Sequence, residues 1–361
     1  MNIGLIGLGK MGCAIAYRLI KDNHTVFGFD NNERAREDAK KMGVCVCDDL
    51  QKLTEHVGVI WLMLPAGKIV DDVIEEIKPF IKNEFIIIDG GNSNFNDSAR
   101  RAHALKQSNI DFLDCGTSGG LKGKEIGFCL MIGGEEKVFK KLESVFKSIA
   151  YDGSVRGNPS TSSGRTDFSK EVFSENCNVS ETSVFSKTIA NTQDERVGSN
   201  PVRPELVEGF LRTAQNGYAY MGPSGAGHYV KMIHNGIEYS ILQSYAEGFD
   251  LLKNGSYKNL DLEKISGVWK NGSVIRSWIL DLTNEVFQKD QELKNISGAI
   301  GENATGRWTL DEAEKQNVPM DLLQKSLDIR ASSRKTGGNF ATKVVAMLRN
   351  KFGGHAVKQN D

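Results

Sequence analysis

Residues 2–12 read NIGLIGLGKMG, a short apolar run followed by a glycine-rich turn with the spacing GxGxxG. A helix-like stretch follows from Cys13 to Lys21, and a second apolar run, Thr25 to Phe29, ends in Asp30. The spacing alone is a weak signal. Between a predicted strand and a predicted helix, however, it indicates a dinucleotide-binding turn.

Each glycine of this turn has its own physical role. Gly7 permits the tight turn, Gly9 lets a pyrophosphate approach the backbone, and Gly12 lets the next helix pack with its positive end toward the phosphates. The turn residues expected to hold the cofactor are Gly7, Leu8, Gly9, Lys10, Met11 and Gly12. The alternative is an ordinary glycine-rich loop that binds no nucleotide.

Asp30 stands where a carboxylate accepts hydrogen bonds from the adenosine ribose hydroxyls and repels a 2′-phosphate. Its presence favours NAD over NADP as the cofactor. Arg34 and Arg36 follow closely and could neutralise a phosphate, so NADP stays possible, although solvated helix surface is the commoner role of such arginines.

Further apolar runs alternate with helix-like segments, at Val59 to Leu64, Phe85 to Ile88 and Asp111 to Leu113. The alternation predicts an α/β fold of the Rossmann type, a doubly wound parallel sheet whose ligands bind beyond the carboxyl ends of the strands. Small residues follow these runs, and we expect four of them to contact the cofactor: Leu64, Pro65, Ala66 and Asn92. An ordinary glycine turn is the alternative at each place.

From about Glu247 onward, amphipathic segments at 260–270, 273–288, 310–316 and 320–332 predict an all-α C-terminal domain. The residues before them, 155–214, are rich in Ser, Thr, Asn and Gly and have no sustained apolar period, which predicts an inserted, disordered loop. The predicted domains are therefore a Rossmann domain at 1–154, the insert at 155–214, and a helical substrate domain at 215–361.

The stretch GHYVKMIHNGIEY, residues 227–239, carries five polar side chains on one predicted helical stripe. They are Lys231, His234, Asn235, Glu238 and Tyr239. Their neighbours are mostly apolar, so the helix is expected to be buried, and burying these groups unpaired would cost several kcal/mol. A stripe of this kind serves ligand chemistry or an internal network. A buried salt bridge between Lys231 and Glu238 would explain only two of the five groups.

Composition excludes other classes of function. The 361 residues carry a net charge of −1, which gives no basic field for nucleic acid or an anionic membrane. No apolar run approaches membrane-spanning length, and a predicted strand that begins at Asn2 leaves no room for a signal peptide, so the cytoplasm is the expected compartment. Six cysteines without CxxC spacing favour reduced thiols over disulfides, and no metal-ligand cluster is visible.

The motifs together resemble the 6-phosphogluconate dehydrogenase family, in its short form with one helical domain. The resemblance covers nearly the whole chain: the GLIGLGKMG opening, the DGGNS and GTSGG loops, the GHYVKMIHNGIEY helix, the TGRWT segment and the RNKFGGH tail. The helix is the specific part, because related β-hydroxyacid dehydrogenases usually have two adjacent asparagines where His234 and Asn235 stand. The longer family members usually carry lysine where Arg307 stands, which changes geometry but keeps charge.

The resemblance implies a role for each site residue. Lys231 would be the general base on the 3-hydroxyl, and Glu238 the acid that protonates the enediol after carbon dioxide leaves. Substrate orientation would fall to Asn92, Ser118, Gly119, Gly120, His234 and Asn235, and the phosphate to Tyr239, Arg307 and Arg330. Arg349 and His355 would belong to a tail that completes the site of a neighbouring subunit, so the resemblance implies a homodimer.

Three functions remain open at this point. The first is oxidative decarboxylation of 6-phospho-D-gluconate to ribulose 5-phosphate, with NAD or NADP and without a metal. The second is a dehydrogenase of an unphosphorylated β-hydroxyacid such as 3-hydroxyisobutyrate. The third is a non-catalytic nucleotide-binding remnant disabled by the insert. Arg307, Arg330 and Arg349 favour the first over the second, and Lys231 and Glu238 disfavour the third.

Overall fold

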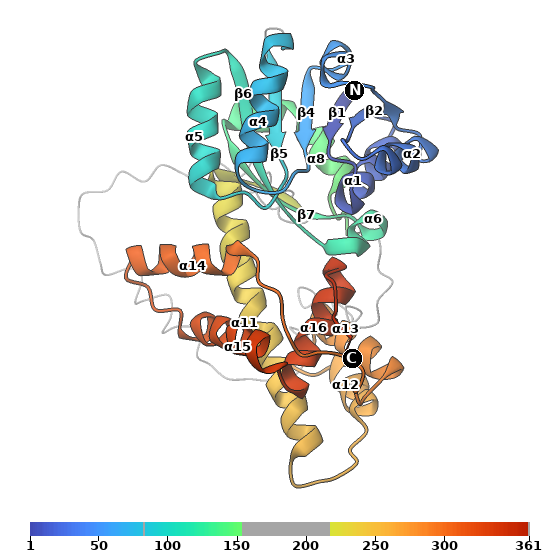
Figure 1. Ribbon diagram of the computed structural model, residues 1–361. Helices are drawn as coiled ribbons and strands as arrows, with labels where there is room; N and C mark the ends of the chain where they lie inside the picture. The colour runs from blue at the N-terminus through green and yellow to red at the C-terminus, as the bar shows by residue number, and fades with distance from the viewer. Residues whose placement is uncertain (82–83, 154–216, 360–361) are drawn as a thin grey trace, which may run out of the picture.

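The computed structural model of the protein describes residues 1–81, 84–153 and 217–359 (Figure 1). The N-terminal part is an eight-stranded sheet with the order β3-β2-β1-β4-β5-β6-β7-β8. The strands are β1 (Asn2–Ile6), β2 (Thr25–Phe29), β3 (Cys45–Val46), β4 (Val59–Leu62), β5 (Phe85–Asp89), β6 (Ile110–Ser118), β7 (Cys129–Gly134) and β8 (Tyr218–Gly222). All neighbouring pairs are parallel except β6 and β7, so the predicted Rossmann-type sheet is confirmed.

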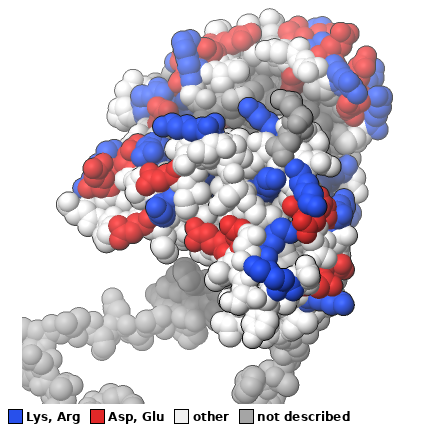
Figure 2. Space-filling model, turned by 60° about the horizontal axis from the view of Figure 1, so that its bottom comes forward, with Lys and Arg blue, Asp and Glu red and all other residues white. Residues whose placement is uncertain are grey.

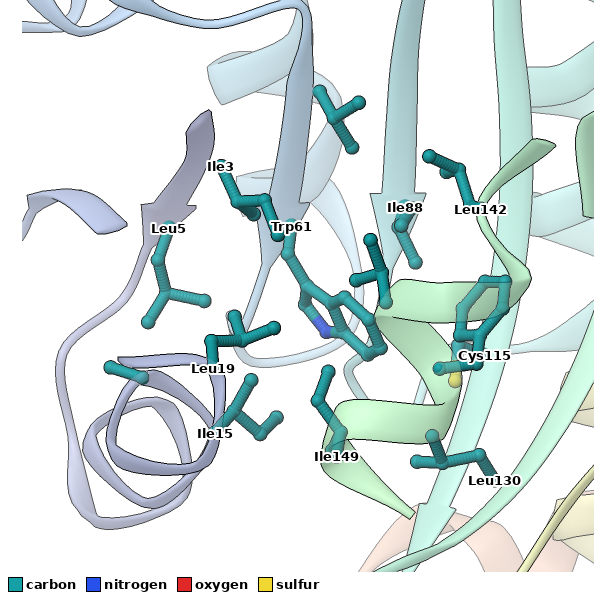
Figure 3. Close-up of a cluster of buried hydrophobic side chains, with 14 of the residues drawn as sticks. Ile3, Leu5, Ile15, Leu19, Trp61, Ile88, Cys115, Leu130, Leu142 and Ile149 are labelled. Atoms are coloured by element: carbon teal, nitrogen blue, oxygen red, sulfur yellow. The ribbon is translucent and has the colours of Figure 1, made fainter. Parts of the chain in front are cut away.

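Helices cover both faces of this sheet, as expected for parallel strands that are apolar on both sides. They are α1 (Lys10–Lys21), α2 (Glu33–Lys41), α3 (Leu50–His56), α4 (Lys68–Ile77), α5 (Phe95–Lys106), α6 (Gly123–Ile126), α7 (Glu136–Lys141) and α8 (Glu143–Ile149), with single turns η1 (Lys78–Phe80) and η2 (Gly120–Lys122). One core lies under α1, α7 and α8, and the other under α3, α4 and α5. In the first core, Trp61 of β4 lies among side chains of α1 and α8 (Figure 3).

One long helix, α11 (Ala226–Asn254), leads from the sheet into the helical part (Figure 1). The remaining helices are α12 (Leu262–Lys270), α13 (Trp278–Lys289), α14 (Ala304–Lys315), α15 (Asp321–Thr336) and α16 (Phe340–Gly353). The apolar faces of α11, α12, α13 and α16 enclose a core of their own, so the predicted all-α C-terminal region is confirmed. On the face seen in Figure 2, Lys and Arg alternate with Asp and Glu rather than gathering by sign.

The sheet extends beyond residue 215, where the sequence-based division assigns the chain to the helical domain. β8 begins at Tyr218 and pairs in parallel with β7. The backbone N–H of Gly217 donates to the carbonyl of Tyr151, and Leu130 donates to the carbonyl of Gly217. The strand has only five residues and follows a polar stretch, so its sequence is too short to predict a strand from apolar alternation. The predicted insert at 155–214 lies outside the described residues.

Candidate active site

A cavity of about 520 Å³ lies where the carboxyl end of β6 meets α11 and the end of α16. Its lining includes most of the predicted substrate residues: Asn92, Ser118, Gly119, Gly120, Lys231, His234, Asn235, Glu238, Tyr239, Arg349 and His355, together with Met11 of the dinucleotide turn. The stripe expected on residues 227–239 therefore faces a single cavity.

Lys231 is held close to the sheet by the way α11 begins. The helix starts after Gly225, whose φ of 96° is left-handed, and no side chain of the helix itself caps it. Asp114 of β6 does so instead: its carboxylate accepts the backbone N–H of Gly225 at 2.6 Å and that of His228 at 2.8 Å. Two residues along β6, a β-carbon at Gly116 would lie 2.3 Å from that of Lys231, so only glycine fits there.

This close packing buries the Lys231 amine, which is 7% exposed. Burial lowers the pKa of Lys231 to about 8, against the opposing charge of Glu238 and Cys129. The amine lies 3.4 Å from Nδ1 of His234, and Nε2 of the same ring lies 3.3 Å from the Ser118 hydroxyl. Burial and the nearby Lys231 charge lower the pKa of His234. A lysine in this setting can accept a proton near neutral pH.

Glu238 lies two helical turns beyond Lys231 on the same stripe. Burial raises the pKa of its carboxyl, while Lys231, Arg330 and Arg349 act in the opposite direction. A carboxyl group whose pKa is raised in this way can hold a proton and donate it later. The two groups that general acid and base chemistry needs are thus both present, in different electrostatic settings.

The far end of the cavity is cationic. The guanidinium of Arg330 lies 3.5 Å from the centre of the Tyr239 ring, and the Tyr239 hydroxyl donates to Asn303. Arg330 is 1% exposed, yet none of its three nitrogens has a hydrogen-bond partner among the described residues. Burial lowers its pKa to about 10. Because a buried guanidinium without partners is costly, this arrangement fits an anionic ligand that supplies the missing acceptors.

Arg349 and His355 approach the same end of the cavity from α16 and the residues after it. Both line the cavity of their own chain, and the expectation that this tail completes the site of a neighbouring subunit stays a prediction. Within the chain, α16 packs against α11, and its end packs so tightly on Gly120 that a β-carbon there would lie 2.0 Å from the Phe352 carbonyl oxygen. Burial lowers the pKa of both Arg349 and His355.

The dinucleotide turn has the geometry that a pyrophosphate requires. Gly7 has a φ of 95°, and a β-carbon at Gly12 would lie 1.9 Å from the Gly7 carbonyl oxygen. A β-carbon at Gly9 would meet nothing within 4 Å in the part of the chain that the structure describes. Helix α1 begins directly after Gly9 without a side-chain cap, so its first N–H groups are open to a phosphate. These residues fit a dinucleotide.

The carboxylate of Asp30 accepts the backbone N–H of Leu8 and that of Asn32, each at 2.7 Å. These bonds fix it at the end of β2, beside the turn. The loop after β4, which contains Leu64, Pro65 and Ala66, also adjoins the turn, because a β-carbon at Gly7 would lie 2.4 Å from the carbonyl oxygen of Met63. The predicted cofactor residues therefore cluster at one edge of the sheet.

Two of the predicted substrate residues, Arg330 and Arg307, do not line the cavity. Arg330 lies against the ring of Tyr239, which does line it, whereas Arg307 lies elsewhere. It is exposed on α14, whose buried residues are Thr305, Gly306, Thr309 and Ala313. Helical phase explains this, because a residue two places after Thr305 points away from the face that packs on α11. Conversely, Thr117, Trp278, Asn303 and Phe352 line the cavity without having been predicted. Thr117 and Phe352 lie within quoted motifs and Asn303 lies close to one, whereas Trp278 lies in none.

Among the described residues, no group of three or more His, Cys, Asp or Glu is arranged to hold a metal ion. Within the same ranges, no helix is both long and apolar enough to cross a membrane.

Two family models match the chain: the NAD binding domain of 6-phosphogluconate dehydrogenase at residues 2–157, and the 6-phosphogluconate dehydrogenase C-terminal domain at residues 227–360. The NAD-dependent, decarboxylating 6-phosphogluconate dehydrogenase of Haloferax volcanii is 34% identical over 100% of both chains. Among solved structures, Plasmodium falciparum 6-phosphogluconate dehydrogenase has a TM-score of 0.69 at 24% identity, covering 93% of this chain and 62% of that one. Mycobacterium tuberculosis 3-hydroxyisobutyrate dehydrogenase has a TM-score of 0.62 at 19% identity, covering 96% and 99%. The two structures share the fold.

Proposed function

The chain belongs to the 6-phosphogluconate dehydrogenase family, and we propose that it oxidises and decarboxylates 6-phospho-D-gluconate to ribulose 5-phosphate and carbon dioxide. The observation that carries the proposal is one cavity that is lined by the buried Lys231 amine of lowered pKa and by Arg349, with Arg330 lying against the ring of Tyr239, another lining residue. The amine suits removal of a hydroxyl proton, and the arginines suit a phosphate.

Lys231 begins the reaction as the base. Its neutral amine takes the proton of the 3-hydroxyl while a hydride leaves carbon 3, and NAD(P)⁺ supplies the acceptor for that hydride. The protonated amine then hydrogen-bonds to the new 3-keto oxygen and stabilises the negative charge that gathers there as carbon dioxide leaves. Ser118, His234 and Asn235 hold the hydroxyls of the sugar acid beside this amine.

Glu238 completes the reaction as the acid. The carbon that lost the carboxylate carries the electron pair of the broken bond as an enediol, and Glu238 donates the proton that converts it to the ketone product. The phosphate is held by Arg349, Tyr239 and His355, which line the cavity, together with Arg330, which lies against the Tyr239 ring. No metal is needed, because the lysine ammonium performs the polarising role.

We propose NAD as the preferred cofactor. The Asp30 carboxylate, fixed by the N–H groups of Leu8 and Asn32, would accept ribose hydroxyls and repel a 2′-phosphate. The NAD dependence of the Haloferax volcanii relative supports this preference. NADP is the weaker alternative cofactor for the same turn.

We also propose a homodimer. An apolar groove runs between α11, the segment before α13 and the start of α15, and its exposed residues include Ile237, Ile241, Val274, Ile275 and Leu322. A contiguous apolar surface of this kind is typical of a protein–protein interface. Because Ile237 and Ile241 also line the substrate cavity, a second subunit in the groove would close one side of the active site.

The test follows NADH formation and carbon dioxide release with 6-phosphogluconate, and then with 3-hydroxyisobutyrate. We expect both products with the first substrate and neither with the second. The Lys231→Met variant should lose about two to four orders of magnitude in kcat, the usual contribution of a general base, while binding NAD like the parent. Oxidation of 3-hydroxyisobutyrate in preference to 6-phosphogluconate would contradict the proposal.

A further inference from the structure

Two loops that flank the dinucleotide turn are held together at their base by a single side chain, Arg101 of α5. The first loop, residues 63–67, follows β4, and the second, residues 90–94, follows β5. The loops touch, since a β-carbon at Gly91 would lie 2.6 Å from the Leu64 carbonyl oxygen. Arg101 lies beneath the point of contact and is only 2% exposed.

The guanidinium of Arg101 has partners on the first loop and at the end of β5, directly before the second loop. Toward the first, it donates to the Gly67 carbonyl at 3.0 Å and forms a two-pronged ion pair with Asp71, in the first turn of α4, at 2.8 and 3.1 Å. Toward the second, it donates to Asp89 at 3.3 Å. A planar guanidinium can make these bonds at once, whereas a lysine ammonium lacks the necessary fork.

Asp89 carries the connection into the second loop. It is fully buried at the end of β5, and it accepts the backbone N–H of Gly91 at 3.1 Å and the hydroxyl of Ser93 at 2.7 Å. Gly91 and Ser93 are the two neighbours of Asn92, which lines the substrate cavity. The position of Asn92 is therefore tied through Asp89 to Arg101, and through Arg101 to Gly67.

We infer that Arg101 is a positioning residue for the cofactor, which sets the spacing between the loop at 63–67 and the loop at 90–94. The inference rests on the proposed NAD site, because these loops are its expected walls beside the dinucleotide turn. Arg101 reaches the substrate cavity only indirectly, through Asp89 and Asn92, so its effect on the cofactor should exceed its effect on the substrate.

Its neighbour Arg100 provides a matched control. Arg100 also pairs with Asp71, at 3.0 Å, but it is more than half exposed, and its other partner is Asp97 on its own helix. It reaches neither Gly67 nor Asp89 in the described contacts. Arg100→Lys and Arg101→Lys thus alter the same residue type, one position apart, with a shared partner.

The experiment measures the dissociation constants of NAD and of 6-phosphogluconate separately by calorimetry, with the melting temperature as a check on folding. We expect Arg101→Lys to weaken NAD binding about tenfold or more, because lysine cannot make all the hydrogen bonds that hold the two loops and at least one charge-assisted bond is lost. Affinity for 6-phosphogluconate should fall by a smaller factor, because Arg101 reaches the substrate only through Asn92, and Arg100→Lys should leave both constants within about twofold of the parent.

If Arg101→Lys does not fold, Asp71→Asn is the second variant. It weakens the two-pronged ion pair with Arg101 but leaves Arg101 bonded to Asp89. It should weaken NAD binding by less, with the same selectivity. Unchanged NAD affinity in a folded Arg101→Lys protein would overturn the inference, and so would an equal loss of affinity for both ligands. If the parent binds NAD but does not oxidise 6-phosphogluconate, the proposed function fails while the NAD comparison still decides the role of Arg101.

Discussion

Lys231 and Glu238 lie on one helix face, and the pKa of each is shifted in the opposite direction to that of the other. Burial favours the uncharged form of each, so it lowers the pKa of the amine and raises that of the carboxyl. Their mutual attraction works against burial in both cases. Burial therefore moves the two pKa values in opposite directions, down for Lys231 and up for Glu238, and the proposed reaction uses both shifts.

A Glu238→Gln variant tests this coupling. The Glu238 charge raises the pKa of Lys231, so its removal should lower that pKa. Because Lys231 must be neutral to act, the acid limb of the profile of log kcat/KM against pH should move to lower pH, by up to about one unit. The overall rate should also fall, since the acid is gone. A limb that stays in place, or moves upward, would contradict the coupling.

Arg330→Met tests the phosphate end. We expect KM for 6-phosphogluconate to rise by about 10- to 100-fold, the value of one or two charge-assisted hydrogen bonds. Any oxidation of D-gluconate, which lacks the phosphate, should be unaffected. The melting temperature should not fall, because the variant removes a buried charge without partners. Arg334→Met is the control, one turn further along α15, where the arginine pairs with Glu302. Equal losses on the two substrates would assign Arg330 another role.

At this scale, the sequence predicted the residues that a helical period brings together. The offsets within residues 227–239 are sufficient to place Lys231, His234 and Glu238 on one stripe, and the structure places all three in the cavity. Arg307 shows where such reasoning ends. Its motif gives no information on which side of α14 faces α11, because that depends on Thr305 and Thr309 packing against a helix far away in sequence.

At the level of elements, the start of α11 is fixed by a side chain from a distant strand. Asp114 accepts two backbone N–H groups of the first turn, and His228 is bonded to Ser98 of α5 at 2.7 Å. Carboxylates are favourable at this end of a helix, where the dipole is positive. The cap sets the height of the helix against the sheet, and therefore the position of the Lys231 amine three residues later.

Asp114→Asn should lower both stability and turnover. An amide has one acceptor oxygen in place of two, so we expect a loss of about 1–3 kcal/mol of unfolding free energy and a lower kcat at temperatures where the protein is folded. Asp261→Asn is the control: Asp261 caps α12 through Lys264, away from the cavity, and should reduce stability without changing kcat. Unchanged kcat in Asp114→Asn would contradict the idea that this cap positions Lys231 for catalysis. Chemical denaturation and steady-state assays supply both values.

Element boundaries were predicted where apolar periodicity is strong and missed where a long-range contact decides them. The run at 111–113 predicted only the first part of β6, which continues to Ser118 because β7 pairs with it in register. α14 begins at Ala304, before the predicted start at 310. Gly306 discourages a helix prediction there, yet a β-carbon at that position would lie 2.7 Å from the Tyr239 ring. Close packing, rather than helix propensity, selects this glycine.

For the whole molecule, the cavity exists only because two differently built parts meet. The sheet contributes Asn92 and Ser118, α11 contributes Lys231, and α16 contributes Arg349. A second contact spans the same junction, where Glu285 of α13 pairs with Lys122 of η2 at 3.3 Å and with Lys351 of α16 at 3.0 Å. Substrate and cofactor are thus expected to be held by parts of the chain with separate cores.

The proposed homodimer is tested by a charge in its groove. Leu322 is 74% exposed there, and Leu251, outside the groove on α11, is 73% exposed. Leu322→Glu should convert the dimer to a monomer in sedimentation, because burying an unpaired carboxylate costs several kcal/mol, whereas Leu251→Glu should leave the dimer intact. A parent chain that sediments as a monomer would rule the proposal out, and dissociation by both variants would place the interface elsewhere.

The hydrogen bond between Gly217 and Tyr151 has a practical consequence. The chain leaves the sheet after Tyr151 and rejoins it at Gly217, and these two residues are hydrogen-bonded, so the two ends of any segment joined here lie side by side. The Tyr151–Gly217 pair is therefore suited as an insertion site. A compact cargo whose own ends lie close together, such as a fluorescent reporter or an affinity domain, can be grafted there in place of the natural residues without altering the path of β8 into α11.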